Sequence, residues 1–345
     1  MTSPPDLLAI GRLGVDIYPQ QIGVGIEDVD TFGKYVGGSA ANVAIAGARH
    51  GLASALVSRT GDDPFGFYLT RELEREYRVD TRFIRRDPDL LTPVTFCAIR
   101  PPEDFPLYFY RRPTAPDLQI TAAEILEAPL ADAVRQARIF WFTGTGLSQE
   151  PSRSAHQVAL RLRSTAAAAL PSGADGDTPR LTVFDLDYRE TFWPSREQAS
   201  QAISGALEFA DVAVGNQTEC AVAVGEGTPD QQADRLLEAG VKLAVVKMGS
   251  QGVLGATASK RVRCPQIAVE VVNGLGAGDS FGGALCRGLL AGWPLEAVLN
   301  FANAAGALVA SRIACSAAMP VEAEVRELLA RAGRPQPPTQ DRSPR

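Results

Sequence analysis

The sequence predicts an α/β protein with a doubly wound, mainly parallel sheet that is flanked by helices. Short, continuous apolar runs recur along the chain, and stretches with helical periodicity separate them. A strand that is apolar along its whole length is typical of a parallel sheet covered on both faces. The runs expected to form this sheet are residues 7–10, 55–57, 139–142, 181–184, 212–214 and 243–246.

The segments between these runs carry the expected helices. They are residues 40–50, 65–77, 151–169, 198–210, 231–238, 278–291 and 295–310. With 345 residues the chain is close to the largest size that one hydrophobic core supports, and we expect a single domain over residues 6–333. The Pro-, Gly- and Asp-rich residues 171–179 indicate an exposed loop, and residues 334–345 indicate a disordered tail.

Two stretches, residues 14–36 and 92–114, depart from the alternation of strands and helices. In the second, residues 94–99 and 107–110 are typical of a hairpin that turns around the prolines at positions 101 and 102. We expect the two stretches to form a small β lid over the edge of the sheet. Apolar strands in an open lid suit edge-to-edge pairing, so a homodimer through the lid is expected.

Composition and charge exclude several classes of function. The net charge of −6 disfavours general attraction to nucleic acid or to an anionic membrane surface. No apolar stretch approaches the roughly 20 residues of a membrane span, and the first residues lack the pattern of a signal peptide, so we expect a cytoplasmic protein. Five scattered cysteines indicate reduced thiols, and two histidines offer little material for a histidine-based metal site or a Ser-His-Asp triad.

A glycine-rich loop near the end of the chain is the most informative segment. It carries Gly274, Gly276 and Gly278 between a short apolar strand at residues 271–272 and a helix. Such glycines let successive N–H groups point at one place, which is also the positive end of the helix dipole and suits a phosphate. Asp279 follows directly, and a carboxylate there makes chemical sense if it takes the proton of an attacking hydroxyl. The alternative is that Asp279 caps the helix and the glycines serve packing.

Other nucleotide-binding loops do not fit this segment. It has no Gly-Lys-Ser or Gly-Lys-Thr ending and is therefore not a P-loop. It also lacks the GxGxxG spacing and the N-terminal position of a dinucleotide-binding fingerprint, which disfavours a dehydrogenase.

Two motifs that bracket the chain resemble the signatures of the ribokinase-like, or PfkB, carbohydrate kinase family. The motifs are Gly37-Gly38-Ser39-Ala40-Ala41-Asn42-Val43-Ala44, leading to Thr60-Gly61-Asp62-Asp63, and Gly276-Ala277-Gly278-Asp279-Ser280-Phe281. The resemblance extends over residues 6–330. It implies a ribokinase-like fold with a small β lid and the transfer of phosphate from ATP, with Mg²⁺, to a sugar hydroxyl.

The resemblance also assigns roles to individual residues. It implies that the hydroxyls of the sugar are held by Asp16, Gly37, Gly38 and Asn42. It implies an anion hole at Gly276, Ala277 and Gly278, with Asp279 as the catalytic base. It also implies that Glu219 acts on ATP-bound Mg²⁺ through water. The residues that it implies for binding the nucleotide are Asn216, Glu219, Lys247, Gly249, Gly252 and Asn303. For Asn216 and Glu219 helix capping is the alternative, since an Asn-to-Glu spacing of three often caps a helix.

One position departs from the family pattern. Relatives usually carry Asp three residues before the first glycine of the motif at 276–279, whereas this chain has Asn273. In some relatives that region helps to hold a monovalent cation, so dependence on such a cation is left open.

The acceptor is indicated by two arginines. The Tyr110-Arg111 pair and Arg189 resemble positions of kinases that act on keto-deoxy sugar acids, where arginine meets the substrate carboxylate. A planar guanidinium can donate two hydrogen bonds to one carboxylate. For Arg111 the alternative is a role as a salt-bridge partner, which is common for an arginine beside a tyrosine on a strand. Further segments, among them Gly11-Arg12 and Phe105-Pro106, resemble one member of that group. The alternatives are a kinase of the same family for 2-keto-3-deoxygluconate or fructose, and a non-catalytic sugar-binding regulatory protein.

Overall fold

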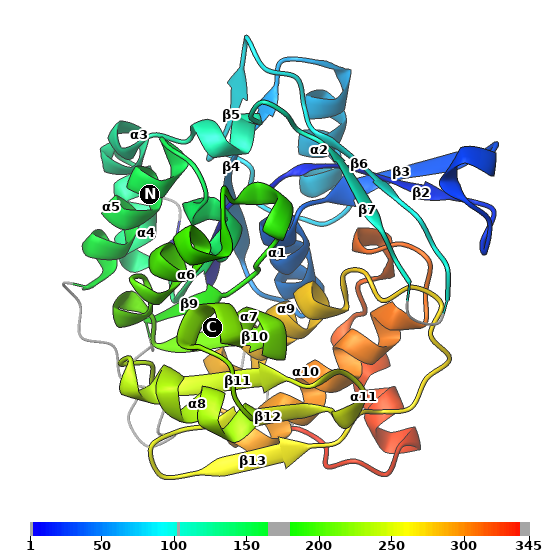
Figure 1. The fold of residues 1–345 in the computed structure, drawn as a ribbon, viewed down its shortest axis with the longest axis vertical. Coiled ribbons are helices and arrows are strands. Elements are labelled where there is room, and N and C mark those ends of the chain that lie inside the picture. The colour runs from blue at the N-terminus through cyan, green and yellow to red at the C-terminus, as the bar shows by residue number, and fades with distance from the viewer. Residues whose placement is uncertain (1–2, 102–103, 165–179, 339–345) are drawn as a thin grey trace.

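A nine-stranded sheet lies at the centre of the molecule in the computed structural model, which describes residues 3–101, 104–164 and 180–338 (Figure 1). In spatial order its strands are β13 (Arg261–Cys264), β12 (Val253–Ala256), β11 (Leu243–Lys247), β10 (Val212–Asn216), β9 (Leu181–Asp185), β8 (Ile139–Thr143), β1 (Leu7–Ile10), β4 (Ser54–Gly61) and β5 (Ile84–Asp87). Neighbouring strands are parallel except that β12 runs against β11 and β13. The prediction of a mainly parallel sheet is confirmed.

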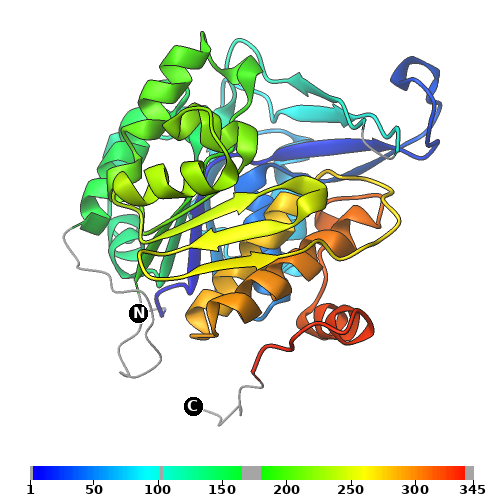
Figure 2. The ribbon, with the colours of Figure 1, turned by 60° about the horizontal axis from the view of Figure 1, so that its bottom comes forward.

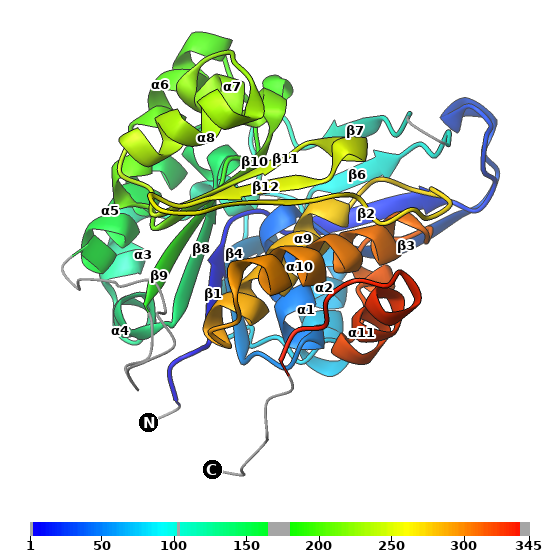
Figure 3. The same ribbon diagram turned by 90° about the horizontal axis from the view of Figure 1, so that it is seen from below.

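Helices cover both faces of this sheet, as Figure 3 shows. One face carries α1 (Ser39–Arg49), α2 (Pro64–Arg75), α9 (Ala277–Leu290), α10 (Leu295–Ala310) and α11 (Glu322–Arg331). The other carries α3 (Ala122–Leu126), α4 (Leu130–Gln136), α5 (Ser152–Ser164), α6 (Arg196–Ser204), α7 (Gln217–Val224) and α8 (Pro229–Glu238). In β1, Leu7 and Ala9 join the first hydrophobic cluster, while Leu8 and Ile10 join the second. Burial on both faces explains why the strands are apolar without alternation.

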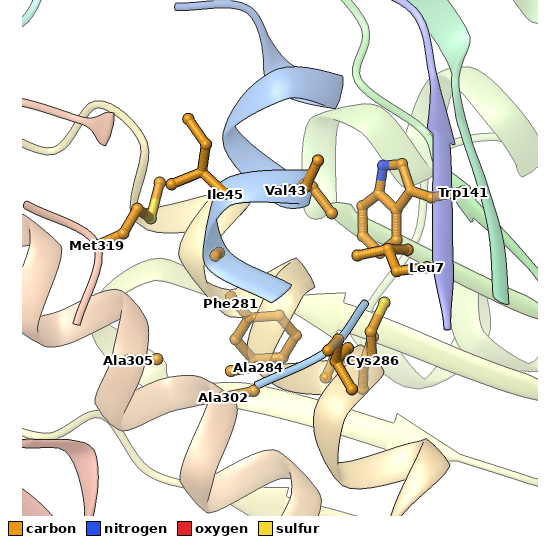
Figure 4. Packing of buried hydrophobic residues seen from close by; sticks show 14 of the residues in the cluster. Leu7, Val43, Ile45, Trp141, Phe281, Ala284, Cys286, Ala302, Ala305 and Met319 are labelled. Carbon is orange, nitrogen blue, oxygen red and sulfur yellow. The ribbon is translucent and has the colours of Figure 1, made fainter. Parts of the chain in front are cut away.

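The helix that follows the glycine-rich loop, α9, is held by close packing in the first cluster (Figure 4). Phe281 and Ala284 of α9 are buried there together with Ala302 of α10. A Cβ atom on Gly283 would lie only 2.4 Å from the Cβ atom of Ala46 in α1, so the two helices touch through their backbones. The start of α9 is therefore fixed relative to the sheet.

A second sheet of four strands projects from one end of the large sheet (Figure 2). Its spatial order is β3 (Phe32–Gly37), β2 (Gly14–Pro19), β6 (Val94–Cys97) and β7 (Leu107–Tyr110). β2 runs against β3 and parallel to β6, and β6 runs against β7. The stretches that interrupt the α/β alternation thus form one small sheet, with β6 and β7 close to the bounds expected for the hairpin.

Some local predictions were wrong or incomplete. Residues 271–272 form no strand, because the N–H groups of Val272 and Asn273 both donate to the carbonyl of Ala310 at the end of α10 rather than to a neighbouring strand. The helix expected over residues 198–210 ends at Ser204, and a short 3-10 helix, Leu207–Phe209, follows it. Residues 165–169 of another expected helix, the loop at 171–179 and residues 339–345 of the tail lie outside the described residues.

The sequence did not predict the short elements α3, α4, α7, α11, β5, β12 and β13. Across residues 3–101, 104–164 and 180–338, no helix combines the length and apolarity that crossing a bilayer demands.

Candidate active site

The site forms at the carboxyl ends of the parallel strands. Arg12 follows β1, Thr145 follows β8 and Asp187 follows β9, while Asn216 and Lys247 end β10 and β11. Asn216 and Lys247 are direct partners in the register of these two strands. Open α/β sheets bind ligands at this edge.

A pocket opens here between the small sheet and the start of α9. Its polar lining consists of Arg12, Asp16, Ser39, Asn42, Thr95, Arg111, Arg189 and Asp279, and its other lining residues are Leu13, Gly14, Tyr18, Gly38, Pro93, Leu107, Phe109, Leu275, Gly276 and Cys315. Gly37, one of the predicted sugar-binding residues, is not among them. A Cβ atom at Gly37 would lie 2.1 Å from Oδ1 of Asp16, so the missing side chain makes room for that carboxylate.

Asp279 is the third residue of α9 and faces α1. Asn42 Nδ2 donates to Asp279 Oδ2 at 2.9 Å. Gly276 takes the N-cap position, and α9 has no side-chain capping bond, so helix capping does not explain Asp279. Burial raises the pKa of Asp279 to about 6, against the opposing hydrogen bond from Asn42. Such a carboxylate is ionised at neutral pH and is basic enough to accept a proton.

The predicted anion hole is a helix N-terminus shaped by Gly276. This glycine has φ of 79°, a left-handed conformation that side chains rarely adopt. The N–H groups of Ala277, Gly278 and Asp279 open the helix, where no preceding turn supplies acceptors. A Cβ atom at Gly278 would lie 3.3 Å from Lys247 Nζ, so an ammonium group stands beside these amides. The site thus concentrates positive charge next to Asp279.

Asp16 of β2 is the second acid of the pocket. Burial is the main cause that raises its pKa to about 7. Arg12 lowers this pKa and the like charge of Asp279 raises it, so the two carboxylates influence each other across the pocket.

A buried ion pair between Arg12 and Asp187 lies in the same region, and neither residue had been assigned a role from the sequence. Arg12 Nη2 is 2.7 Å from Asp187 Oδ2, and Arg189 Nε is 3.4 Å from Asp187 Oδ1. Burial alone would raise the pKa of Asp187, but Arg12 and Arg189 outweigh it and the pKa lies below its ordinary value. Their position directly after apolar strands was the available signal in the sequence.

The two arginines predicted to read the substrate both line the pocket. Arg111 Nη2 donates to both carboxylate oxygens of Asp117, at 3.0 and 2.8 Å, and its guanidinium lies 4.8 Å from the ring centre of Phe192. The Arg189 side chain is 42% exposed and contacts the Asp187 carboxylate through Nε. Arg111 also lines a neighbouring pocket, and Arg112 lines that neighbouring pocket but not this one.

On the nucleotide side, Asn216 and Glu219 form a capping box at the start of α7. Asn216 Oδ1 accepts from the N–H of Glu219 at 2.9 Å, and Glu219 Oε2 accepts from the N–H of Asn216 at 2.7 Å. The capping alternative is therefore present in the structure. Burial lowers the pKa of Lys247, but Glu219 and Asp185 outweigh it and the net shift is upward. Lys247 is consequently a permanent positive charge at the site.

Gly249, Gly252 and Asn303 lie farther along the same side. Both glycines have positive φ, 57° and 89°, in the turn after β11. Asn303 Nδ2 donates to the carbonyl of Pro265 at 2.9 Å, so its amide is engaged with the loop that precedes α9.

The donor set near the anion hole does not form a cage for a metal ion. Within the described ranges, no group of three or more His, Cys, Asp or Glu side chains is arranged to hold one. Buried Glu219 and Asp185 both act on Lys247, and burial raises the pKa of Asp185 well above its ordinary value against the opposing charge of Lys247. These residues fit a Mg²⁺ ion that is held chiefly by phosphate oxygens and water.

Comparison with known proteins identifies the family. The sequence profile of the pfkB family carbohydrate kinase matches residues 5–322. The 5-dehydro-2-deoxygluconokinase of Geobacillus thermodenitrificans is 31% identical over 332 residues, 94% of this chain and 93% of the relative. Fructokinase-1 of Oryza sativa is 32% identical over 331 residues, 94% of this chain and 97% of the relative.

Solved structures agree in fold. An uncharacterized sugar kinase from Pyrococcus horikoshii aligns with a TM-score of 0.75 at 26% identity and covers 94% of this chain and 99% of its own. A putative ribokinase from E. coli in complex with ATP and Mg²⁺ aligns with a TM-score of 0.81 at 24% identity, with coverage of 94% and 99%. The chain belongs to the PfkB family and is an ATP-dependent carbohydrate kinase.

Proposed function

We propose that this kinase transfers the γ-phosphate of ATP to the 6-hydroxyl of 5-dehydro-2-deoxy-D-gluconate, giving 6-phospho-5-dehydro-2-deoxy-D-gluconate and ADP in myo-inositol breakdown. The observation that carries the proposal is that Arg111 and Arg189 both line the pocket that also holds Asp16 and Asp279. A neutral sugar has no carboxylate for these two guanidinium groups to bind, whereas a sugar acid has one. The names of several relatives agree with this acceptor.

The pocket suggests how the acceptor lies. Asp16 accepts hydrogen bonds from sugar hydroxyls, and the backbone at Gly38 and the amide of Asn42 border the same space. Arg111 meets the carboxylate with Nε and Nη1, since Asp117 engages only Nη2 among the described contacts. The 6-hydroxyl then points toward Asp279.

Transfer begins when Asp279 takes the proton of the 6-hydroxyl. The hydroxyl oxygen forms a bond to the γ-phosphorus, the bond between that phosphorus and the bridging oxygen breaks, and ADP leaves with the electron pair. The N–H groups of Ala277, Gly278 and Asp279 stabilise the negative charge of the moving phosphoryl group, with Lys247 beside them. Glu219 would hold an ATP-bound Mg²⁺ ion through water, and the ion would supply charge neutralisation on the phosphates. Asn216, Gly249, Gly252 and Asn303 border the nucleotide in this proposal.

The small sheet acts as a lid in this proposal. It belongs to one kinase domain over residues 6–333, in which residues 14–36 and 92–114 close over the sugar. The outer strands β3 and β7 offer edges for pairing with a second copy in a homodimer. Five cysteines, all buried and free, suit the reducing cytoplasm.

A panel of acceptors with coupled ADP detection tests the proposal. We expect the highest kcat/KM for 5-dehydro-2-deoxygluconate, with 2-keto-3-deoxygluconate and fructose as the competing acceptors. A higher kcat/KM for fructose would make this chain a fructokinase, as one relative is named. ADP formation with none of the sugars would favour the non-catalytic sugar-binding alternative.

A further inference from the structure

We infer that Arg12 is a positioning residue of the kinase site, which holds Asp187 and, through it, Arg189 beneath the reacting groups. The inference deepens the proposed function and rests on it, because Arg12 lines the pocket that is proposed to bind the acceptor. Neither the glycine-rich motif nor the predicted carboxylate readers include this residue.

Arg12 joins four separate parts of the fold. It leaves the end of β1, and its Nε donates to Thr145 Oγ1 after β8 at 3.1 Å. Its Nη2 donates to Ser39 Oγ at the start of α1, at 2.9 Å, and to Asp187 Oδ2 after β9, at 2.7 Å. Only 7% of Arg12 is exposed, so these contacts are made out of bulk water, where they fix geometry strongly.

Asp187 is the residue that these contacts hold in place. Its φ of 26° is unusual for a residue with a side chain and persists only where the surroundings impose it. Arg12, Ser39 and Thr145 all donate to Oδ2 of Asp187. Oδ1 is thereby turned toward Arg189, two residues along the chain and otherwise exposed. Arg12 therefore helps to fix the position of the Arg189 guanidinium, because both arginines bind the same Asp187 carboxylate.

The charge of Arg12 also acts on both acids of the pocket. Asp16 faces Arg12 and Asp279, and Asp279 faces Asn42, Asp187, Arg12 and Arg189. Arg12 lowers the pKa of both acids, and the negative charge of Asp187 raises that of Asp279. Loss of Arg12 should therefore raise the pKa of both acids, whereas loss of the Asp187 charge should lower the pKa of Asp279.

A second buried arginine, Arg163, provides a matched control. It is 6% exposed, and its guanidinium donates to the backbone carbonyls of Val134, Ala137 and Leu181. It does not line the pocket and is not among the groups that act on Asp16 or Asp279. The Arg163→Met variant therefore shows how the loss of a buried guanidinium affects the protein when the pocket itself is unchanged.

The test measures kcat, KM and the pH profile of kcat/KM for Arg12→Met, Asp187→Asn and Arg163→Met. We expect kcat/KM at neutral pH to fall about 10²-fold in the first two variants, since a displaced binding group of this kind costs roughly that much. The acidic limb should move to higher pH in Arg12→Met and to lower pH in Asp187→Asn. Arg163→Met should leave the limb where it is. A limb that stays in place in both site variants, or moves the same way in both, would overturn the inference.

The conservative variant Arg12→Lys separates charge from geometry. An ammonium keeps the positive charge but cannot reach Ser39, Thr145 and Asp187 together, so the limb should return close to its wild-type position while kcat/KM stays low. Full recovery of kcat/KM would contradict a positioning role. Because it keeps the buried charge paired, this variant also preserves the test should Arg12→Met not fold.

A readout without any acceptor keeps this inference apart from the proposed function. Carbon-13 NMR titration of the Asp16 and Asp279 carboxyls, assigned with the Asn variants, should show both midpoints raised in Arg12→Met. Absence of phosphorylation by the wild type would refute the proposed function and leave this shift intact. Unchanged midpoints in an active enzyme would refute the role of Arg12 alone.

Discussion

At the scale of single residues, the site is defined by two acids with different surroundings. Asp279 lies at the positive end of a helix and accepts from Asn42, whereas Asp16 lies on a strand of the small sheet beside Arg12. Burial raises the pKa of each, to about 6 for Asp279 and about 7 for Asp16. Asp279, the proposed base, therefore ionises at a lower pH than Asp16.

Removal of that base should affect turnover far more than nucleotide binding. We expect Asp279→Asn to lower kcat by about 10²- to 10⁴-fold, because the amide cannot accept the hydroxyl proton. Calorimetric titration with an ATP analogue should give nearly the wild-type Kd. Asp132→Asn, an exposed substitution of the same kind, is the control. An unchanged kcat in Asp279→Asn would remove it from the mechanism.

The acidity of the two carboxyls sets the pH dependence. Since both must be ionised to accept hydrogen bonds or protons, kcat/KM should fall as the pH drops through the interval between about 7 and about 6. Below that interval the loss should exceed about tenfold per pH unit, because two protons are taken up. Initial rates in a constant-ionic-strength buffer series measure the limb. A midpoint below about pH 5 would be incompatible with these two groups.

In the proposed function, Arg111 binds the carboxylate of the sugar acid. We expect Arg111→Leu to raise KM for the sugar acid several-fold or more and to leave phosphorylation of fructose nearly unchanged. Arg112→Leu, at a neighbour that does not line the pocket of Asp16 and Asp279, should alter neither. Equal losses for both acceptors would show that Arg111 acts on folding or on the lid instead.

At the scale of elements, the sequence predicted the strands and helices that have a regular apolar pattern. It did not predict local structure that depends on contacts between residues far apart in the chain. The apolar strands and the long helices α1, α9 and α10 were predicted close to their bounds, since burial on both faces leaves a clear pattern. Residues 271–272 have the same apolar character, yet they bond to the end of α10. Of the site, the motif residues were predictable, whereas Arg12 and Asp187 required knowledge of which strand ends are neighbours.

The loop before α9 is held by Asn273, which is fully buried. Asn273 Nδ2 donates to the carbonyl of Ile313 at 2.6 Å, and Oδ1 accepts from the N–H of Leu275 at 3.0 Å. Asn273→Asp replaces a donor by an acceptor and should lower the free energy of unfolding by about 1–3 kcal/mol, with a loss of kcat. Urea denaturation measures this.

The same substitution also addresses the cation question. We expect wild-type activity to be insensitive to added potassium, because the Ile313 carbonyl already has a donor, and Asn273→Asp to regain part of its activity in potassium. Asn303→Asp breaks a similar bond at a less buried position, so it should lower the free energy of unfolding by less than Asn273→Asp does. A potassium requirement in the wild type would contradict this account.

At the scale of the whole molecule, a buried histidine couples stability to pH. His50 is 3% exposed, and neither ring nitrogen has a hydrogen-bond partner among the described residues. Burial lowers its pKa to about 4 from 6.5. Between these values the unfolded chain binds a proton that the folded protein does not, so His50 should destabilise the fold progressively as the pH falls from 6.5 to about 4.

The His50→Gln variant isolates this contribution from those of other groups. We expect the stability of the wild type relative to the variant to fall by about 1.4 kcal/mol per pH unit in that interval and to be constant above about pH 7. Urea unfolding at about pH 7 and about pH 5 supplies the comparison. A pH-independent difference would mean that His50 titrates normally in the folded state.

The backbone contact between Gly283 and Ala46 has a consequence for how this enzyme tolerates mutation. The amides proposed to bind the phosphate lie at the start of α9, and the position of this helix depends on the absence of a side chain at Gly283, farther along it. A methyl group added there would tilt the helix and misdirect the amides while leaving every group that touches substrate unchanged. Substitutions at interior positions such as Gly283 should therefore be among the most damaging to this kinase, and mutagenesis limited to the pocket residues would miss them.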